Sequence, residues 1–453
     1  MGFYDKSARL TQQQPCETHR FRSLDIVGNF VRIVLVKWHA PALWWLGLDS
    51  WRGSFEPDTL PVMEKADAHS QWVEIDESAL RHNLRTFRNI VTTGVSLAAV
   101  VKANAYGHGL SEIAPVAATE VDWLAVHSAE EARSIRRLGI NIPIMIMGFV
   151  PRTDCHDLDK DIHVFVSTVD VIRWIGEYRR SNGISLPLHL KIDTGTRRQG
   201  VTLPRISALC RAAAEEGLSV VGAATHFANI EDTLEHEFAR HQMRQFEGAV
   251  EALRIELGGE VPFVHAACSA AALLFRETDY NLVRLGISAY GHWPSRETKV
   301  TWNLDHRPDR VELRPVLSWR ATIGQIQEVD KSESVGYGRT WTALRATRLA
   351  VLPVGYADGY TRSLGNRARV LVHGRLVPVV GRVCMNIMMV DVTDVPDASV
   401  GDEVVIIGCQ GDAEVSAEEL AAMSGTINYE LLARISSSIP RFVIDGAAPE
   451  VQA

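Results

Sequence analysis

Residues 95–109 read V-S-L-A-A-V-V-K-A-N-A-Y-G-H-G, an apolar run that ends in a lysine and breaks into a glycine-rich turn. A short apolar run between turn residues is typical of a buried strand in a parallel sheet. Lys102 then lies at the edge of a core, where partial removal from water lowers the pKa of an amine and favours its reaction with carbonyl compounds. A lysine at a strand end can also simply extend its charge into solvent. The remainder of the chain has to decide between these two interpretations.

Composition limits the classes of protein to which the chain can belong. With 453 residues, 46% of them hydrophobic, it is long enough for two or more domains. The net charge is -8 and the charges are interspersed, so we expect no nucleic-acid partner and no membrane partner. The six cysteines are scattered without a CxxC pair, which argues against a metal site and a disulfide framework. Without a convincing export signal, a cytoplasmic location is expected.

Residues 1–70 form an N-terminal extension to which the sequence assigns no role. Segment 25–48 is apolar in patches and rich in tryptophan, but Arg32, Lys37 and His39 interrupt it. It therefore lacks the roughly 20 consecutive apolar residues of a transmembrane helix, and it begins too late for an ordinary signal peptide. An arm packed on the main body, an interfacial helix and a start codon assigned too far upstream all remain open.

Strand-like runs alternate with helical patterns from Trp72 to about residue 300. Ser78 is expected to cap the first helix, in which Leu80, Leu84 and Phe87 recur at helical spacing. The eight strand-like runs are 95–101, 123–126, 144–150, 164–166, 186–192, 220–227, 263–268 and 282–290. This order predicts an α/β fold with a (β/α)8 TIM-like barrel over residues 71–300, although a doubly wound sheet gives a similar pattern.

Strand patterns with glycine turns predominate after the barrel. The strand-like runs are 317–329, 349–355, 369–373, 377–383, 388–392 and 403–408. Helical patterns are few, and the clearest covers residues 416–423. Residues 301–453 are therefore predicted to form a mainly β C-terminal domain.

Reactive residues of a (β/α)8 barrel lie at the carboxyl ends of its strands. In this chain those ends carry Lys102, Lys191, His226, Ser269 and Arg284. Taken singly, His226 could be a hydrogen-bonded core histidine and Ser269 a helix N-cap. Because five such residues lie at the ends of five of the predicted strands, we expect them to meet in a catalytic site.

Motifs in both predicted domains resemble those of the alanine racemases, which are pyridoxal-phosphate enzymes of fold type III. In chain order they read V-K-A-N-A-Y-G-H-G, L-K-I-D-T-G, A-T-H-F-A, V-R-L-G-I, V-G-Y-G-R-T, P-V-G-Y-A-D-G, V-G-R-V-C-M-N and I-N-Y-E. The resemblance extends from about Trp72 to Arg441. It implies a homodimer that uses pyridoxal 5'-phosphate to racemise L-alanine to D-alanine, which supplies peptidoglycan synthesis.

The resemblance implies two proton-transfer bases. Lys102 is expected to bind the cofactor covalently and to serve as one base, and Tyr337 of the partner subunit as the other. A racemase needs a base on each face of the substrate Cα, because one face loses the proton and the other regains it. A phenol ordinarily has a pKa near 10, so a tyrosine base needs cationic neighbours. Arg284 is expected to face the pyridine nitrogen of the cofactor and to limit transamination.

The resemblance also implies how the cofactor phosphate is held. Its expected ligands are the side chains of Tyr106, Ser269 and Tyr429 and the backbone of Gly286 and Ile287.

Further residues are implied near the cofactor ring and the substrate. His226 is expected beside the ring, and Arg198 near the phenolic oxygen of the cofactor and the substrate carboxylate. Met385 of the partner subunit is expected to offer a backbone donor to that carboxylate. Lys191 matches a lysine that can be carbamylated, which gives an anion to orient Arg198.

Two positions depart from the pattern of the family. Cys268 stands before Ser269 where asparagine is usual, and Asn386 stands where aspartate is commoner. Asn386 removes a negative charge from the substrate entrance, so a racemase of broader specificity that acts on serine or lysine remains an alternative. A non-catalytic cofactor carrier on the same barrel needs neither a second domain nor Tyr337. A related decarboxylase would want an acidic group where this chain has Arg284.

Overall fold

The computed structural model describes residues 69–232, 235–304 and 311–445, all within one structural unit of the chain, residues 57–453. Residues 1–68, nearly all of the predicted N-terminal extension, lie outside these ranges. Within the described ranges, no helix is long and apolar enough to cross a membrane. The cysteines at positions 155, 210, 268, 384 and 409 carry free thiols.

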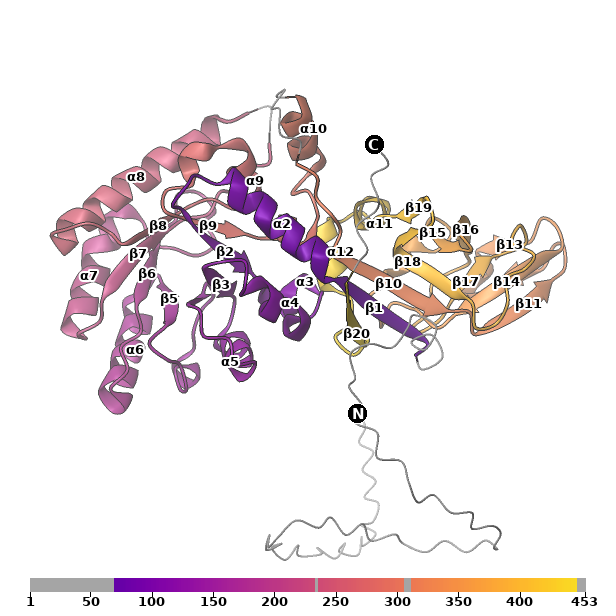
Figure 1. Cartoon of the computed structure of the whole chain (residues 1–453), viewed down its shortest axis with the longest axis horizontal. Coiled ribbons are helices and arrows are strands. Elements are labelled where there is room, and N and C mark those ends of the chain that lie inside the picture. The colour runs from indigo at the N-terminus through magenta and orange to yellow at the C-terminus, as the bar shows by residue number, and fades with distance from the viewer. Residues whose placement is uncertain (1–68, 233–234, 305–310, 446–453) are drawn as a thin grey trace, which may run out of the picture. The chain divides into compact units, whose positions relative to one another are not determined.

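Eight parallel strands form the first sheet (Figure 1). In spatial order they are β8 (Phe263–His265), β7 (Val220–Ala224), β6 (Leu188–Lys191), β5 (Ile162–Val166), β4 (Ile144–Ile146), β3 (Trp123–Val126), β2 (Ser96–Val100) and β9 (Leu282–Leu285). Backbone hydrogen bonds from Asn281 to Val264 (3.3 Å) and from Arg284 to Ala267 (3.1 Å) join β9 to the end of β8 and close the barrel. The predicted barrel is confirmed, and each predicted run overlaps one of these strands.

Helices alternate with the barrel strands along the chain, beginning with α2 before β2. They are α2 (Glu77–Ile90), α4 (Leu110–Ala117), α5 (Ala129–Arg137), α6 (Val169–Asn182), α7 (Ile206–Glu215), α8 (Glu237–Leu257), α9 (Ser269–Leu274) and α10 (Arg296–Leu304). In α2 the predicted stripe Leu80, Leu84 and Phe87 is buried. The prediction that Ser78 caps this helix is wrong. The helix already begins at Glu77, so the cap is Asp76, whose carboxylate accepts from the Ala79 N–H at 2.8 Å.

The mainly β C-terminal domain is confirmed as a second, largely antiparallel sheet. Its strands include β10 (Leu317–Thr322), β11 (Gln325–Val329), β14 (Thr347–Leu352), β15 (Arg369–Val372), β16 (Arg375–Val380), β17 (Met388–Asp391), β18 (Glu403–Gln410), β19 (Ala413–Val415) and β20 (Arg441–Ile444). Two helices follow, α11 (Ala417–Ser424) and α12 (Asn428–Ala433). A separate two-stranded ribbon, β12 (Ser334–Val335) with β13 (Trp341–Thr342), carries Tyr337 between its strands.

Strand β1 (Gln71–Asp76) belongs to this second sheet, although the sequence placed residues 71–76 with the barrel. It pairs antiparallel with β10 and parallel with β20. Its four central residues are buried on both faces, as in an interior strand. Glu74 among them is paired with Arg320 of β10 at 2.6 Å. The pattern predicts a strand here but carries no information on which sheet receives it.

Candidate functional site

The carboxyl ends of five barrel strands bring together the side chains that the sequence singled out. Lys102 follows β2, Lys191 ends β6, and His226 lies two residues beyond β7. Ser269 begins α9 after β8, and Arg284 lies in β9. The positive charges of Lys191, Arg284, Arg198 and Lys102 all add to burial in lowering the pKa of His226 well below its ordinary value. These groups therefore share one strongly cationic region.

Lys102 is partly buried in this region. Burial and then the charge of Arg198 lower the pKa of its amine, the charge of Arg284 acts in the same direction, and Glu131 opposes them. A lowered pKa makes the neutral, nucleophilic amine available nearer to neutral pH.

The turn after Lys102 has an unusual backbone. Ala103, Asn104, Ala105 and Tyr106 have φ between 52° and 55°, a left-handed turn within α3 (Lys102–Tyr106). Each such residue costs about 1–2 kcal/mol, so the surroundings must hold the turn. The Ala103 N–H donates to the Glu131 carboxylate at 2.6 Å.

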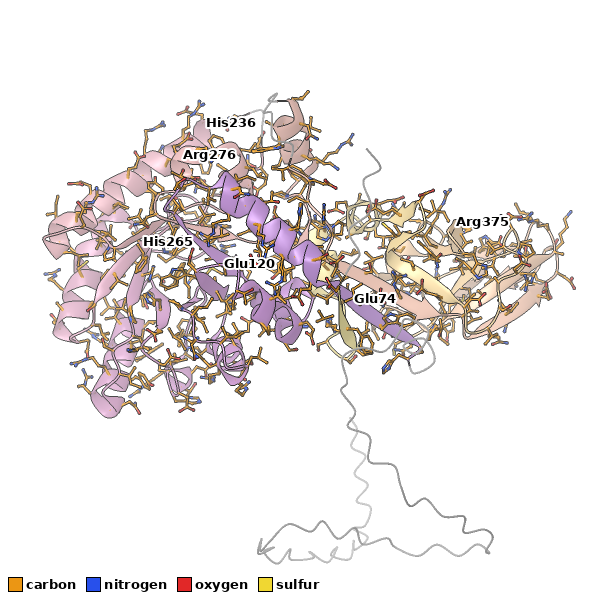
Figure 2. All side chains as sticks on the ribbon, in the orientation of Figure 1. Glu74, Glu120, His236, His265, Arg276 and Arg375 are labelled. Atoms are coloured by element: carbon orange, nitrogen blue, oxygen red, sulfur yellow. The ribbon has the colours of Figure 1, made fainter. Side chains whose placement is uncertain are left out.

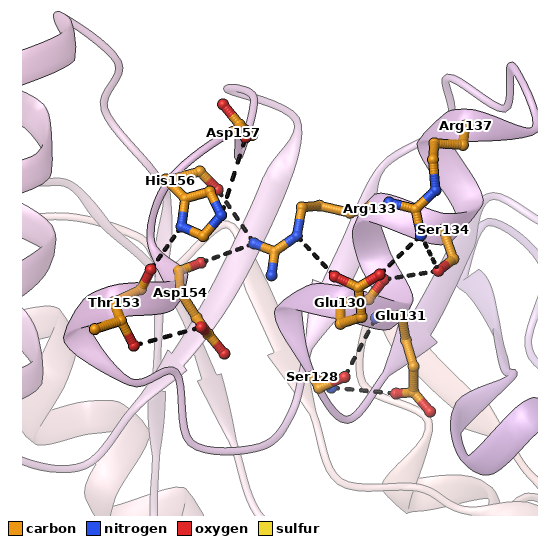
Figure 3. A network of polar contacts seen from close by, with 10 residues as sticks. All are labelled: Ser128, Glu130, Glu131, Arg133, Ser134, Arg137, Thr153, Asp154, His156 and Asp157. Atoms are coloured by element: carbon orange, nitrogen blue, oxygen red, sulfur yellow. Dashed lines mark hydrogen bonds and ion pairs between the residues drawn. The ribbon is translucent and has the colours of Figure 1, made fainter. Parts of the chain in front are cut away.

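Glu131 is itself held by the start of α5. Its carboxylate accepts from the backbone N–H of His127. It also accepts from the Ser128 N–H, and the Ser128 hydroxyl accepts from the Glu131 N–H (Figure 3). This reciprocal capping box fixes the carboxylate that meets Ala103. Sequence analysis missed Glu131, because the capping pattern predicts a helix start but not a contact with a turn 28 residues away.

Gly107 closes the turn against the second domain. At its φ of +85°, a Cβ atom here lies 2.0 Å from the Leu432 carbonyl oxygen of α12. Arg441 donates to the Gly107 carbonyl at 2.8 Å. The ring of Tyr106 lies 6.1 Å from that of Tyr429, also in α12. The C-terminal domain of the same chain therefore forms one wall of the site.

A small polar cradle lies between β8 and β9. The Ser269 hydroxyl accepts from the N–H groups of Gly286 (3.0 Å) and Ser288 (3.4 Å). A Cβ at Gly286 lies 3.0 Å from the Tyr106 hydroxyl, so the absence of a side chain there keeps the cradle open. Burial raises the pKa of Tyr106 and of Tyr429, which keeps both phenols as hydrogen-bond donors.

Arg284 is 5% exposed and is held by acceptors of the barrel. One terminal nitrogen donates to His265 Nδ1 (2.6 Å) and the His265 carbonyl (3.0 Å). The other donates to the carbonyls of Thr225 (2.7 Å) and Ala266 (3.0 Å). Within the described ranges, Nε–H is the one guanidinium donor that these contacts leave free. Burial lowers the pKa of Arg284 to about 10, so it stays charged at neutral pH.

Lys191 is a buried amine without an ion pair in the part of the chain that the structure describes. Burial, with the charges of Arg284 and Arg198, lowers its pKa well below the ordinary value. Its Nζ lies 5.7 Å from the centre of the Phe165 ring. A neutral buried amine of this kind is nucleophilic.

Gln242 is a second residue that supports the site and that the sequence did not predict. It is fully buried in α8, donates to Thr194 (3.1 Å) and to the His226 carbonyl (3.2 Å), and accepts from Ala228 (3.0 Å). It thereby ties the segments that follow β6 and β7. A single glutamine on a helix gives no sequence signal for such a contact.

Tyr337, Met385 and Asn386 do not contact the described residues of the barrel site. Tyr337 is 70% exposed and Met385 57% exposed, and Asn386 beside it is exposed as well. Among the described residues, the side chain of Tyr337 makes no hydrogen bond and no ring contact. Arg198 is exposed at the rim, within electrostatic range of Lys102 and Lys191. The described residues also hold no cluster of three or more histidine, cysteine, aspartate or glutamate residues able to bind a metal ion.

Comparison with known families assigns both domains. The family described as "Alanine racemase, N-terminal domain" matches residues 75–294, and "Alanine racemase, C-terminal domain" matches residues 316–443. The alanine racemase of Leptospira interrogans is 37% identical over 384 residues, which cover 84% of this chain and 97% of the relative. That of Symbiobacterium thermophilum is 39% identical over 375 residues, or 82% and 96% of the two chains.

Solved structures give the same result. Alanine racemase from Bacillus anthracis with bound L-Ala-P is 33% identical and superposes with a TM-score of 0.76, covering 83% of this chain and 95% of that one. The Clostridium difficile 630 enzyme in complex with cycloserine is 32% identical with a TM-score of 0.74, covering 83% and 97%.

Proposed function

The chain belongs to the alanine racemase family, as an isomerase, and on that premise we propose that it interconverts L- and D-alanine with pyridoxal 5'-phosphate and two protein bases. The observation that carries the proposal is the amine of Lys102, partly buried at the barrel mouth with its pKa lowered by burial and by Arg198. An amine in this state suits covalent attachment of an aldehyde cofactor.

The residues around Lys102 fit such a cofactor. The cradle of Ser269, Gly286 and Tyr106 offers hydroxyl and N–H donors to a phosphate, and the neighbouring Ser288 hydroxyl is buried without a hydrogen-bond partner among the described residues. Tyr429 and the Ile287 backbone complete the proposed phosphate site, with His226 beside the ring. When bound, the cofactor supplies an electron sink that acidifies the proton on the amino-acid Cα.

The two bases act on opposite faces of that carbon. Lys102 Nζ takes or returns the proton on one face, and Tyr337 of the partner subunit does so on the other. The exposure of Tyr337 in one chain supports this arrangement, because its hydroxyl is free to enter a neighbouring site. The backbone of Met385 of the partner subunit and the guanidinium of Arg198 hold the substrate carboxylate. Lys191, if carbamylated, supplies the anion that orients Arg198.

Arg284 sets the electronic character of the site. Its free Nε–H can only donate, so it favours a pyridine nitrogen that carries a lone pair. Such a nitrogen withdraws less charge from the substrate carbon than a protonated one. Proton transfer is then favoured over transamination.

The proposed physiological role is supply of D-alanine for peptidoglycan in the cytoplasm. The five free cysteines of the described residues suit a reducing compartment. The alternative is a broader racemase that acts on serine or lysine, and the observation that favours it is the exposed, uncharged Asn386. A non-catalytic carrier or a decarboxylase is disfavoured by Tyr337 and Arg284.

A coupled assay of the purified chain with L-alanine, L-serine and L-lysine tests the proposal. We expect D-alanine to form fastest, and Lys102→Ala to lower the rate about 10³-fold or more. Comparable rates on serine or lysine, restored to alanine preference by Asn386→Asp, would favour the broader enzyme. Absence of racemisation by the cofactor-loaded chain would overturn the proposal.

A further inference from the structure

Three histidines of the barrel interior form a continuous hydrogen-bonded chain that ends on Arg284. His265 Nδ1 lies 2.6 Å from the guanidinium, and His265 Nε2 lies 2.8 Å from His189 Nδ1. His189 Nε2 lies 2.9 Å from His163 Nδ1. Figure 2 labels His265, the first member, among the barrel strands. The chain runs from β8 through β6 to the amino-terminal half of β5, away from the end of the barrel that carries Lys102.

The chemistry of arginine sets the direction of this chain. A guanidinium can only donate hydrogen bonds, so His265 Nδ1 must accept. Its Nε2–H then donates to His189, and His189 donates in turn to His163. All three rings are thereby fixed as neutral Nε2–H tautomers. Burial agrees with neutrality, since it lowers the pKa of His163 to about 4 and that of His189 and His265 well below the ordinary value.

The three hydrogen-bonded histidines face the buried guanidinium of Arg284, which lacks an acidic partner. Within the described ranges Arg284 makes no ion pair, and its other acceptors are backbone carbonyls. A neutral imidazole is negative at its lone pair and positive at its N–H, so three rings in series present their negative ends toward the guanidinium. A carboxylate in this place cancels the positive charge, whereas polarised neutral rings stabilise it and leave it in force.

We propose that His265, His189 and His163 are positioning residues that replace a counter-ion, holding the guanidinium of Arg284 in one orientation with its charge and its Nε–H available to the site. The inference rests on the proposed function only for the group that this N–H receives. The chain of tautomers is a property of the protein with or without that group. His163 is the informative member, because two imidazoles separate it from Arg284.

The test measures the tautomers directly, by 15N NMR of histidine-labelled full-length enzyme loaded with cofactor. In the wild type, all three rings are expected to show a protonated Nε2 and an unprotonated Nδ1 at pH 7.5. His163→Phe removes the last acceptor but leaves the direction that Arg284 sets, so His265 and His189 should keep their tautomers. The Nε2–H of His189 then has no hydrogen-bond acceptor, so its 15N resonance should move, the absorbance of the bound cofactor should shift, and kcat should fall about 10-fold with little change in KM.

Two variants separate the chain from simple packing. His163→Gln keeps an acceptor oxygen and should retain the wild-type spectrum and kcat. Phe263→Leu alters a ring whose centre lies 5.7 Å from that of His163 and 5.6 Å from that of His189 but which makes none of the hydrogen bonds, and it should leave the cofactor absorbance and kcat unchanged.

A charged ring or a protonated Nδ1 at any of the three positions in the wild type would overturn the proposal, even if His163→Phe fails to fold. So would a His163→Phe enzyme in which the His189 Nε2 resonance and kcat are both unaltered. If the three histidines show the expected tautomers but the protein has no racemase activity, the proposed function is overturned, while the proposal for the histidines is supported.

Discussion

The residues at the barrel mouth are dominated by positive charge. Lys102, Lys191, Arg198 and Arg284 lie within electrostatic range of His226. The carboxylates that act on the two lysines, Glu131 and Asp193, are engaged by backbone N–H groups. Burial, and then repulsion by the neighbouring cations, lowers the pKa of both lysines. The same field attracts anions, so the proposed phosphate and substrate carboxylate would offset the repulsion among these cations.

Replacement of Arg284 tests its effect on reaction course. Arg284→Glu places an acidic group where a donor was, so protonation of the pyridine nitrogen is no longer opposed. We expect transamination, measured as pyruvate formed from alanine, to rise about 10-fold or more relative to racemisation. Arg284→Lys, which keeps the positive charge, is the matched control and should leave the ratio near that of the wild type. An unchanged ratio in the glutamate variant would contradict the proposed role.

The buried histidines predict a loss of stability in mild acid. Burial lowers the pKa of His163 to about 4, against an opposing effect of Asp161, while the unfolded chain keeps a value near 6.5. Between these values the unfolded state binds more protons, so stability falls as the pH drops from 6.5 toward 4. We expect His163→Phe to show a smaller drop in Tm between pH 7.5 and 5 than the wild type. Phe263→Leu should keep the wild-type drop, and equal drops in all three proteins would contradict the assignment.

At the scale of elements, the turn after β2 connects Lys102 to both domains. Four left-handed residues follow Lys102, Glu131 of α5 holds the start of the turn, and Leu432 of α12 packs against its end at Gly107. The cost of such a backbone, about 1–2 kcal/mol per residue, is met by these contacts. The position of the amine therefore depends on the fit between barrel and C-terminal domain.

Two glycines with the same φ allow the cost of backbone strain to be measured apart from the cost of a steric clash. Gly94 and Gly107 both have a φ of +85°, but a Cβ at Gly94 meets nothing within 4 Å, whereas one at Gly107 meets the Leu432 oxygen at 2.0 Å. Gly94→Ala should cost about 1 kcal/mol. Gly107→Ala should cost about 3 kcal/mol or more, because backbone has to move, and it should also lower activity. Similar shifts of Tm in the two variants would show that the contact at Gly107 is unimportant.

The sequence predicts the elements of this fold better than their partners. Apolar runs fix the eight barrel strands, since each must be buried on both faces. The same kind of pattern predicts β1 but cannot tell that it joins β10 and β20, because pairing depends on residues almost 250 and 370 positions away. Likewise, the motifs pointed to Lys102 and Arg284, while Glu131, Gln242 and the three histidines gave no signal. Their roles arise only from contacts between elements.

At the scale of the whole molecule, one chain does not complete the site proposed above. Tyr429 of the C-terminal domain packs near Tyr106 in the turn after Lys102. Tyr337 and Met385 of the same domain are exposed, and their side chains make no hydrogen bond, ion pair or ring contact with the described part of the barrel. A two-base reaction needs a second base at the substrate. A head-to-tail homodimer supplies it if each C-terminal domain reaches the barrel of the other subunit, which gives two composite sites by symmetry.

Mixing two inactive variants tests this assembly. If each site combines the barrel of one subunit with Tyr337 of the other, Lys102→Ala removes the base of the barrel and Tyr337→Phe removes the base from the partner. A mixed dimer then has one site that lacks both bases and one site that is intact. Random exchange of subunits should therefore restore about a quarter of wild-type activity. If both bases came from the same chain, every site in the mixed dimer would keep one defect and no activity would return. Lys102→Ala mixed with Arg198→Ala, two barrel variants, is the control in which no recovery is expected under either arrangement.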